Sequence, residues 1–172
     1  MLVRIANDWE QGMTITYADI KQQKIKLDEG RQARRVKLQR DVGNLMNAYR
    51  DSLSLEYPQW FDKGDVARPY VTVGFFNDNK RYEKTSIASL QLDKEHKISF
   101  LISTVVDDSP TKGDHYIISV SLYYNAGVLI AEIGDGQCNI SVANPDAEDG
   151  FTEVIEEIKQ LIITGLTDHS LD

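Results

Sequence analysis

The sequence predicts an α+β fold, in which a long N-terminal helical segment and a C-terminal helix pack on one face of an antiparallel meander of about six strands. Three observations lead to this prediction. Residues 17–53 contain no proline and mostly good helix formers. Runs rich in Ile, Val and Tyr, separated by turn residues, then extend to residue 142. Helical spacing of apolar residues returns after residue 150.

Length and composition predict one ordinary globular domain, residues 1–172. The 172 residues are 41% hydrophobic and 27% charged, which is enough for one sizeable core. The sequence has no internal repeat and no low-complexity linker. Residues 1–13 precede the first well-formed segment, so we expect them to be peripheral.

The N-terminal helical segment is predicted to begin after Thr16, with Asp19 in the capping-box position. Gly30 and Gly43 each cost about 1 kcal/mol in a helix interior. Residues 17–53 therefore form either one long helix or two helices broken near Gly30, and Gly43 is a candidate for a close contact with the sheet. The second half has an apolar face at spacings of three and four, formed by Leu38, Val42, Leu45, Met46, Tyr49 and Leu53.

An aromatic segment follows the helix, which must end before Pro58 because a proline forces its predecessor out of helical geometry. Tyr57, Trp60 and Phe61 in this segment have two interpretations. The usual burial of aromatic residues favours a loop that folds back and caps the core. The competing interpretation is an exposed aromatic patch that binds a partner.

Alternating apolar residues predict strands at 68–77, 85–92 and 97–106, of which the last two are joined by a polar hairpin loop. Three more strands are predicted within 115–142. They are separated by two clusters of Gly, Asn and Asp, residues that supply the positive φ angles of tight hairpins.

The C-terminal helix is predicted to open at Asp149 or Gly150, and Gly165 stands where a glycine commonly follows a helix end. Its apolar residues fall on one stripe, which we expect to lie against the sheet. The stripe consists of Phe151, Val154, Ile155, Ile158, Leu161 and Ile162.

Charge is distributed unevenly along the chain, whose formal net charge is −8. Residues 21–50 hold nine lysines and arginines against three acidic residues, a net charge of +6. Residues 107–172 hold thirteen acidic residues against two lysines, a net charge of −11. Ordinary solvated surfaces account for such a layout without any function, because an exposed ion pair contributes only about 0–1 kcal/mol. If the basic or the acidic segment is instead a binding surface, each implies a different partner.

The acidic half predicts a surface that faces another protein, one with a basic surface. Such complementarity steers association and raises its rate. We therefore expect a non-enzymatic cytoplasmic binding protein of the inhibitor, immunity or adaptor type. The candidate partner-binding residues are Asp107, Asp108, Asp135, Asp146, Glu148 and Asp149.

The basic helix 21–50 supports an alternative, a nucleic-acid-associated accessory protein that contacts phosphates. The negative net charge and the lack of aromatic residues interleaved for base stacking make nucleic acid the less favoured partner. The candidate phosphate contacts are Arg31, Arg34, Arg35 and Lys37.

No catalytic, cofactor-binding or metal-binding constellation is evident in the sequence, and no cofactor is expected. His96, His115 and His169 lack the spacing of a helical metal-binding pair. Cys138, the single cysteine, has no histidine nearby in sequence and is expected in the core. An enzyme whose site is assembled only by tertiary contacts is the second alternative.

The sequence also predicts no membrane contact. No apolar run reaches the roughly 18 residues that cross a bilayer, and the first residues lack the apolar stretch of a signal peptide. A soluble cytoplasmic protein is therefore expected.

Overall fold

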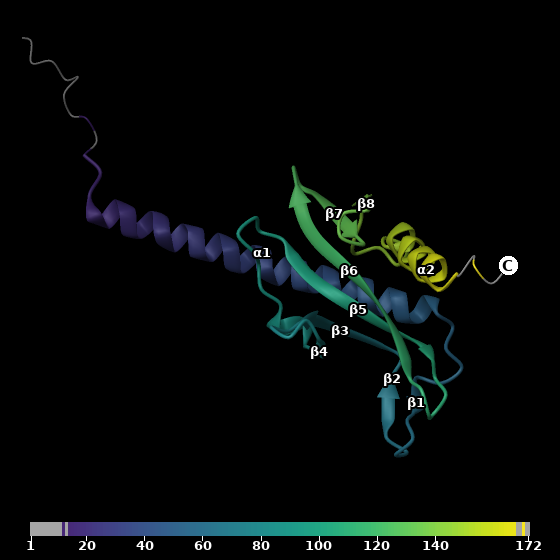
Figure 1. Cartoon of the computed structure of the whole chain (residues 1–172). Coiled ribbons are helices and arrows are strands. Elements are labelled where there is room, and N and C mark those ends of the chain that lie inside the picture. Colours follow the sequence, from purple (N-terminus) through teal and green to yellow (C-terminus); the bar gives the residue numbers. More distant parts are fainter. Residues whose placement is uncertain (1–11, 13, 168–169, 171–172) are drawn as a thin grey trace, which may run out of the picture.

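The computed structural model describes residue 12, residues 14–167 and residue 170, so most of the predicted peripheral segment 1–13 and His169 lie outside the described residues (Figure 1). The elements in chain order are α1 (Tyr17–Ser52), β1 (Gln59–Phe61), β2 (Ala67–Pro69), β3 (Val71–Phe76), β4 (Tyr82–Lys84), the 3-10 helix η1 (Ile87–Ser89), β5 (Ile98–Asp107), β6 (Asp114–Asn125), β7 (Val128–Ile133), β8 (Cys138–Val142) and α2 (Thr152–Leu166).

Six strands form one antiparallel sheet in the order β4–β3–β5–β6–β7–β8, which confirms the predicted α+β fold. The three strands predicted within 115–142 are β6, β7 and β8. β1 and β2 form a separate two-stranded ribbon that the sequence pattern did not predict. In Figure 1 this ribbon lies beyond the end of the sheet at which the β5–β6 loop also lies.

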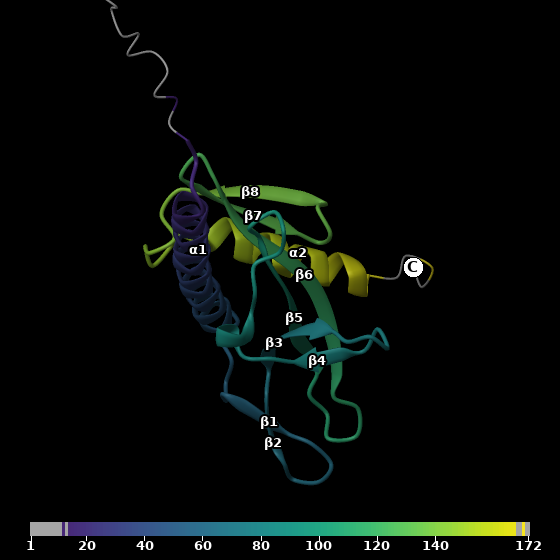
Figure 2. The same ribbon diagram turned by 90° about the vertical axis from the view of Figure 1, so that its left-hand side faces the viewer.

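α1 is one unbroken helix, which decides between the two forms that the sequence allowed. The predicted capping box is present: the backbone N–H of Asp19 donates to the Thr16 hydroxyl at 3.2 Å, and the N–H of Thr16 donates to the Asp19 carboxylate at 2.8 Å. Burial begins only at Leu38. Residues 17–30 of α1 are all exposed, and Figure 1 shows the N-terminal part of the helix projecting beyond the sheet, while Figure 2 views this end of α1 almost end-on.

Both helices contact β6 and each other, and together they cover one face of the sheet. The C-terminal half of α1 buries the predicted face, and the Tyr49 hydroxyl forms a buried hydrogen bond with Thr104 on β5 at 2.8 Å. The predicted packing of α2 is confirmed, because its stripe is buried. The fully or nearly fully buried residues of that stripe are Phe151, Val154, Ile155, Ile158 and Ile162, and Leu161 is partly buried.

The strand predicted at 85–92 is wrong. β4 lies before this segment, and η1 lies within it. The side-chain amide of Gln39 on α1 donates to the backbone carbonyls of Ala88 and Leu90, at 3.2 and 2.9 Å. The segment therefore docks on α1. Of the predicted hairpin, one isolated β-bridge remains, between Leu92 and Ile98.

Two glycines differ from their predicted roles. Gly43 has no atom within 4 Å of the position that a Cβ would take, so it marks no close contact with the sheet. Gly165 lies inside α2, which continues to Leu166, and not after its end. A Cβ at Gly165 would overlap the hydroxyl of Tyr116, so the missing side chain allows β6 and α2 to approach.

A buried carboxylate lies between α1 and β6. Asp41 is fully buried, and its Oδ2 accepts a hydrogen bond from the Tyr124 hydroxyl at 2.6 Å, while its Oδ1 has no partner among the described residues. Burial, which disfavours the charged form, raises the pKa of Asp41 above its ordinary value, and the Tyr124 hydrogen bond offsets this only in part.

Replacing Asp41 should change the pH dependence of stability. A carboxyl group whose pKa is raised by folding contributes stability that is fully present below its unfolded pKa and is lost as pH rises through the folded pKa. Asp41→Asn removes this titration. The unfolding free energy of the wild type relative to the variant should therefore increase as pH falls from 7 to 4, which urea unfolding at several pH values measures. A difference that stays constant with pH would contradict the raised pKa.

Candidate functional site

The predicted acidic residues do not form one continuous surface. β6 spans the sheet lengthwise from Asp114 to Asn125. Asp107 and Asp108 lie at the Asp114 end. Residues 146–149 follow β8, whose last residue lies beside the start of β7 at the opposite end. At about 3.3 Å per strand residue, the two ends are roughly 35 Å apart.

Two of the acidic residues outside the β5–β6 loop, Asp135 and Asp146, have partners within the chain. Asp135, in the β7–β8 turn, accepts a hydrogen bond from the Ser119 hydroxyl at 2.8 Å. Asp146 lies 3.5 Å from the Arg40 guanidinium on α1, an exposed pair of little energetic weight. Glu148 and Asp149 are exposed near Asp146 in sequence. The acidic residues thus divide into the pair at the β5–β6 loop, Asp135 in the β7–β8 turn, and a group near α1 that consists of Asp146, Glu148 and Asp149.

The predicted basic residues are largely engaged in holding α1 on the sheet. The Arg34 guanidinium and the Lys37 ammonium lie 5.2 and 4.0 Å from the ring centre of Tyr124. Arg35 donates to the side chain of Gln91 at 2.9 Å. Arg31 lines a crevice beside the turn that precedes β5. Three of the four predicted phosphate contacts therefore have intramolecular partners.

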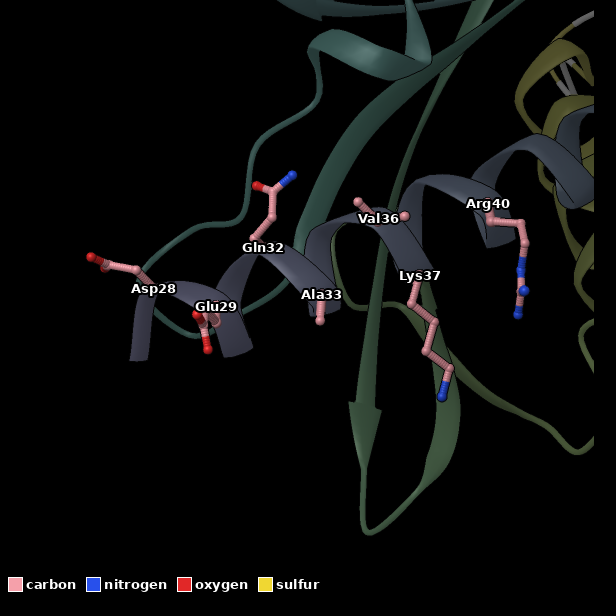
Figure 3. A pocket seen from close by; sticks show the side chains of 7 residues that line it. All are labelled: Asp28, Glu29, Gln32, Ala33, Val36, Lys37 and Arg40. Atoms are coloured by element: carbon pink, nitrogen blue, oxygen red, sulfur yellow. The ribbon is translucent and has the colours of Figure 1, made fainter. Parts of the chain in front are cut away.

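A hollow of about 910 Å³ runs along one face of α1, but it is not an enclosed site. All seven lining residues come from this single helix, with Asp28 and Glu29 toward one end, Ala33 and Val36 in the middle, and basic side chains toward the other (Figure 3). A convex helix alone cannot surround a ligand, because ligand sites are concave. This face of α1 is therefore not a candidate ligand-binding site.

Neither interpretation of the aromatic segment, a loop that caps the core or an exposed patch, holds for all three of its aromatic residues. Trp60 is only 8% exposed, whereas Tyr57 and Phe61 are 65% and 56% exposed. The buried core cluster formed by the helices and the sheet does not include Trp60. The segment therefore builds the β1–β2 ribbon and presents two aromatic side chains to solvent.

These side chains line a groove of about 610 Å³ beside the β5–β6 loop. The sequence did not single out Tyr70, which joins them because β3 pairs with β5 and brings Tyr70 to the loop: the backbone N–H of Val105 donates to the Tyr70 carbonyl at 2.8 Å. No local sequence signal marks this long-range pairing. The groove is lined by Tyr57, Pro58, Gln59, Trp60, Phe61, Tyr70, Asp108, Ser109 and Pro110.

Gly113 determines where Trp60 lies. Gly113 has a φ of +64°, and a Cβ built on it would lie 2.5 Å from Cη2 of Trp60. A glycine is therefore needed both for the loop conformation and for the space that the indole ring fills. The indole N–H of Trp60 is buried and has no acceptor among the described residues. Such a donor carries a desolvation cost when it is left unpaired.

Carboxylates border the groove. The Tyr70 hydroxyl donates to Asp108 at 2.7 Å, and this hydrogen bond raises the pKa of Tyr70, with a further contribution from the charges of Asp108 and Glu56. Asp107 accepts the Ser109 N–H at 2.9 Å and lies 3.8 Å from Lys112. The hydrogen bonds from Ser109 lower the pKa of Asp107, so it is held in its charged form.

One serine–histidine pair lies within hydrogen-bond distance in the described part of the chain. The Ser103 hydroxyl lies 3.1 Å from Nδ1 of His115, but Ser103 is only 2% exposed, so a substrate cannot reach its oxygen. Cys138 is partly buried on β8, where burial raises the pKa of its thiol. No cluster of three His, Cys, Asp or Glu residues suited to a metal ion occurs within the described ranges. None of the helices there has both the length and the apolar character to span a bilayer.

Comparison with known proteins assigns no family to the chain: no protein-family model, no curated protein and no solved structure matches it. The aromatic groove and its carboxylates therefore carry the functional argument by themselves.

Proposed function

We propose that this chain is a non-enzymatic cytoplasmic binding protein, of the inhibitor, immunity or adaptor type, whose partner is a protein with a basic surface. The observation that carries the proposal is the aromatic groove beside Asp107 and Asp108. Tyr57 and Phe61 remain largely exposed there, although burial of aromatic side chains is favourable.

The composition of the groove fits a protein interface. Tyr, Trp and Phe are enriched at the centres of interfaces, where they contribute much of the binding free energy, and polar residues surround them. Here Asp108 lines the groove beside the aromatic side chains, and the charge of Glu56, the residue before Tyr57, acts on Tyr70. Carboxylates at the edge of an interface favour a basic partner and speed the encounter with it.

Charge reversal beside the groove should slow association with the partner. In Asp108→Lys combined with Glu56→Lys, the association rate constant should fall roughly tenfold at low salt, and its salt dependence should become weaker, because edge charges act mainly on encounter. The partner is first captured with the full chain from nuclease-treated extract of the cells that produce it. Association is then measured by stopped flow at several salt concentrations.

The control is Glu148→Lys combined with Asp149→Lys, which makes the same change of charge near Asp146, at the opposite end of the sheet. This control should associate almost as fast as the wild type. Equal slowing by both double variants would contradict a role of the groove. Retention of nucleic acid in untreated extract, without a protein partner, would instead favour the basic-helix alternative.

A further inference from the structure

Cation–π contacts already occur in this fold, and they show which aromatic faces its own cations cover. The ammonium of Lys97 lies 4.5 Å from the ring centre of Tyr123, and Tyr124 is contacted by Arg34 and Lys37. No such contact involves an aromatic ring of the groove in the described part of the chain. The groove therefore presents aromatic faces to which a cation from another molecule can bind.

Two of the three basic side chains nearest to the groove in sequence, Arg68 and Lys112, pair with carboxylates, and the third, Lys63, covers no aromatic ring of the groove in the described part of the chain. Arg68 donates to Asp62 at 2.9 Å, and Lys112 lies 3.8 Å from Asp107. Asp108 uses Oδ2 to accept the Tyr70 hydroxyl, and its Oδ1 accepts no hydrogen bond from a described residue. One carboxylate oxygen at the groove is thus open to a donor from outside the chain.

The geometry points to the aromatic groove as a receptor for one cationic side chain, an arginine in first place, that the partner protein presents between the aromatic rings and Asp108. This inference rests on the proposed function and names the chemistry of the same site. A guanidinium is planar, stacks on aromatic faces and donates to a carboxylate in the same pose, which an ammonium does less well.

A short peptide tests this inference without the partner. The probe is acetyl-Gly-Arg-Gly-amide, and the matched control replaces arginine with citrulline, which has nearly the same shape and no charge. Binding is followed by Trp60 fluorescence in the full chain carrying Trp9→Phe, because the sequence has two tryptophans. The arginine peptide should bind about tenfold more tightly than the citrulline peptide, and the lysine peptide should lie between them.

Two variants separate charge from apolar contact. Tyr57→Leu combined with Phe61→Leu retains apolar side chains at exposed positions but removes two aromatic faces, and Asp108→Asn removes the carboxylate charge. Each should reduce the preference for arginine over citrulline severalfold.

Equal binding of the two peptides, or equally tight binding of an uncharged proline-rich peptide, would overturn the inference. So would an absence of peptide binding. In that case the association-rate experiment still tests the proposed function, because that experiment does not require an arginine of the partner to bind in the groove.

Discussion

Ile158→Ala should lower the free energy of unfolding by about 2–5 kcal/mol, the range for truncation of a fully buried isoleucine. Ile158 is 0% exposed on α2, which packs on α1, β6 and β7. The cost arises from lost apolar burial and from the cavity that the surrounding rigid elements fill only in part. Urea unfolding of the wild type and the variant measures it.

Ile163→Ala is the matched control, since it makes the same chemical change five residues further along the same helix, at a side chain that is 60% exposed. It should change the unfolding free energy by no more than about 0.5 kcal/mol. A loss below that value for Ile158→Ala would show that this face of α2 is not core.

Gly74→Ala should destabilise the protein by about 1–3 kcal/mol through overpacking, although alanine is a small residue. Gly74 lies in β3, between β4 and β5. A Cβ at Gly74 would overlap the backbone carbonyl of Glu83 and would lie 2.5 Å from the ring of Tyr82. The Tyr82 hydroxyl is hydrogen-bonded to Thr72 at 2.7 Å, so the ring cannot move away without loss of that bond.

Gly43→Ala provides the opposite case. Gly43 lies inside α1 with open space around its Cβ position. Alanine there should raise the unfolding free energy by up to about 1 kcal/mol, because it costs less backbone entropy in a helix than glycine. Thermal and urea unfolding measure both changes. If the unfolding free energy changed in the same direction in Gly74→Ala and Gly43→Ala, the close contacts around Gly74 would not explain the effect of its replacement.

The elements that sequence reasoning identified are those whose signal is local. Thr16 and Asp19 form a capping box within one turn, and the period of Leu38, Val42 and Leu45 marks the buried face of α1. The strands β6, β7 and β8 are separated by turns with positive φ, at Gly127 and Gly134 among others. Each of these features depends on residues that are neighbours in the chain.

The failures came where a distant element changed the outcome. Residues 85–92 alternate like a strand, but Gln39 on α1 takes backbone acceptors in this segment. Gly165 resembles a glycine after a helix end, but its role is to leave space for Tyr116 on β6. No window of the sequence contains both partners of either contact.

The α+β class, the separation of basic and acidic charge, and the buried faces of both helices could be predicted from the sequence, because composition and periodicity are properties of short stretches of the chain. Which charges lie together depends on the tertiary structure. It placed Asp108 against Tyr70, roughly 35 Å from the acidic residues beside α1, and it engaged Arg34 and Lys37 with Tyr124. The reason is strand pairing: the pairing of β3 with β5 sets which residues share the groove, and it acts between positions far apart in the chain.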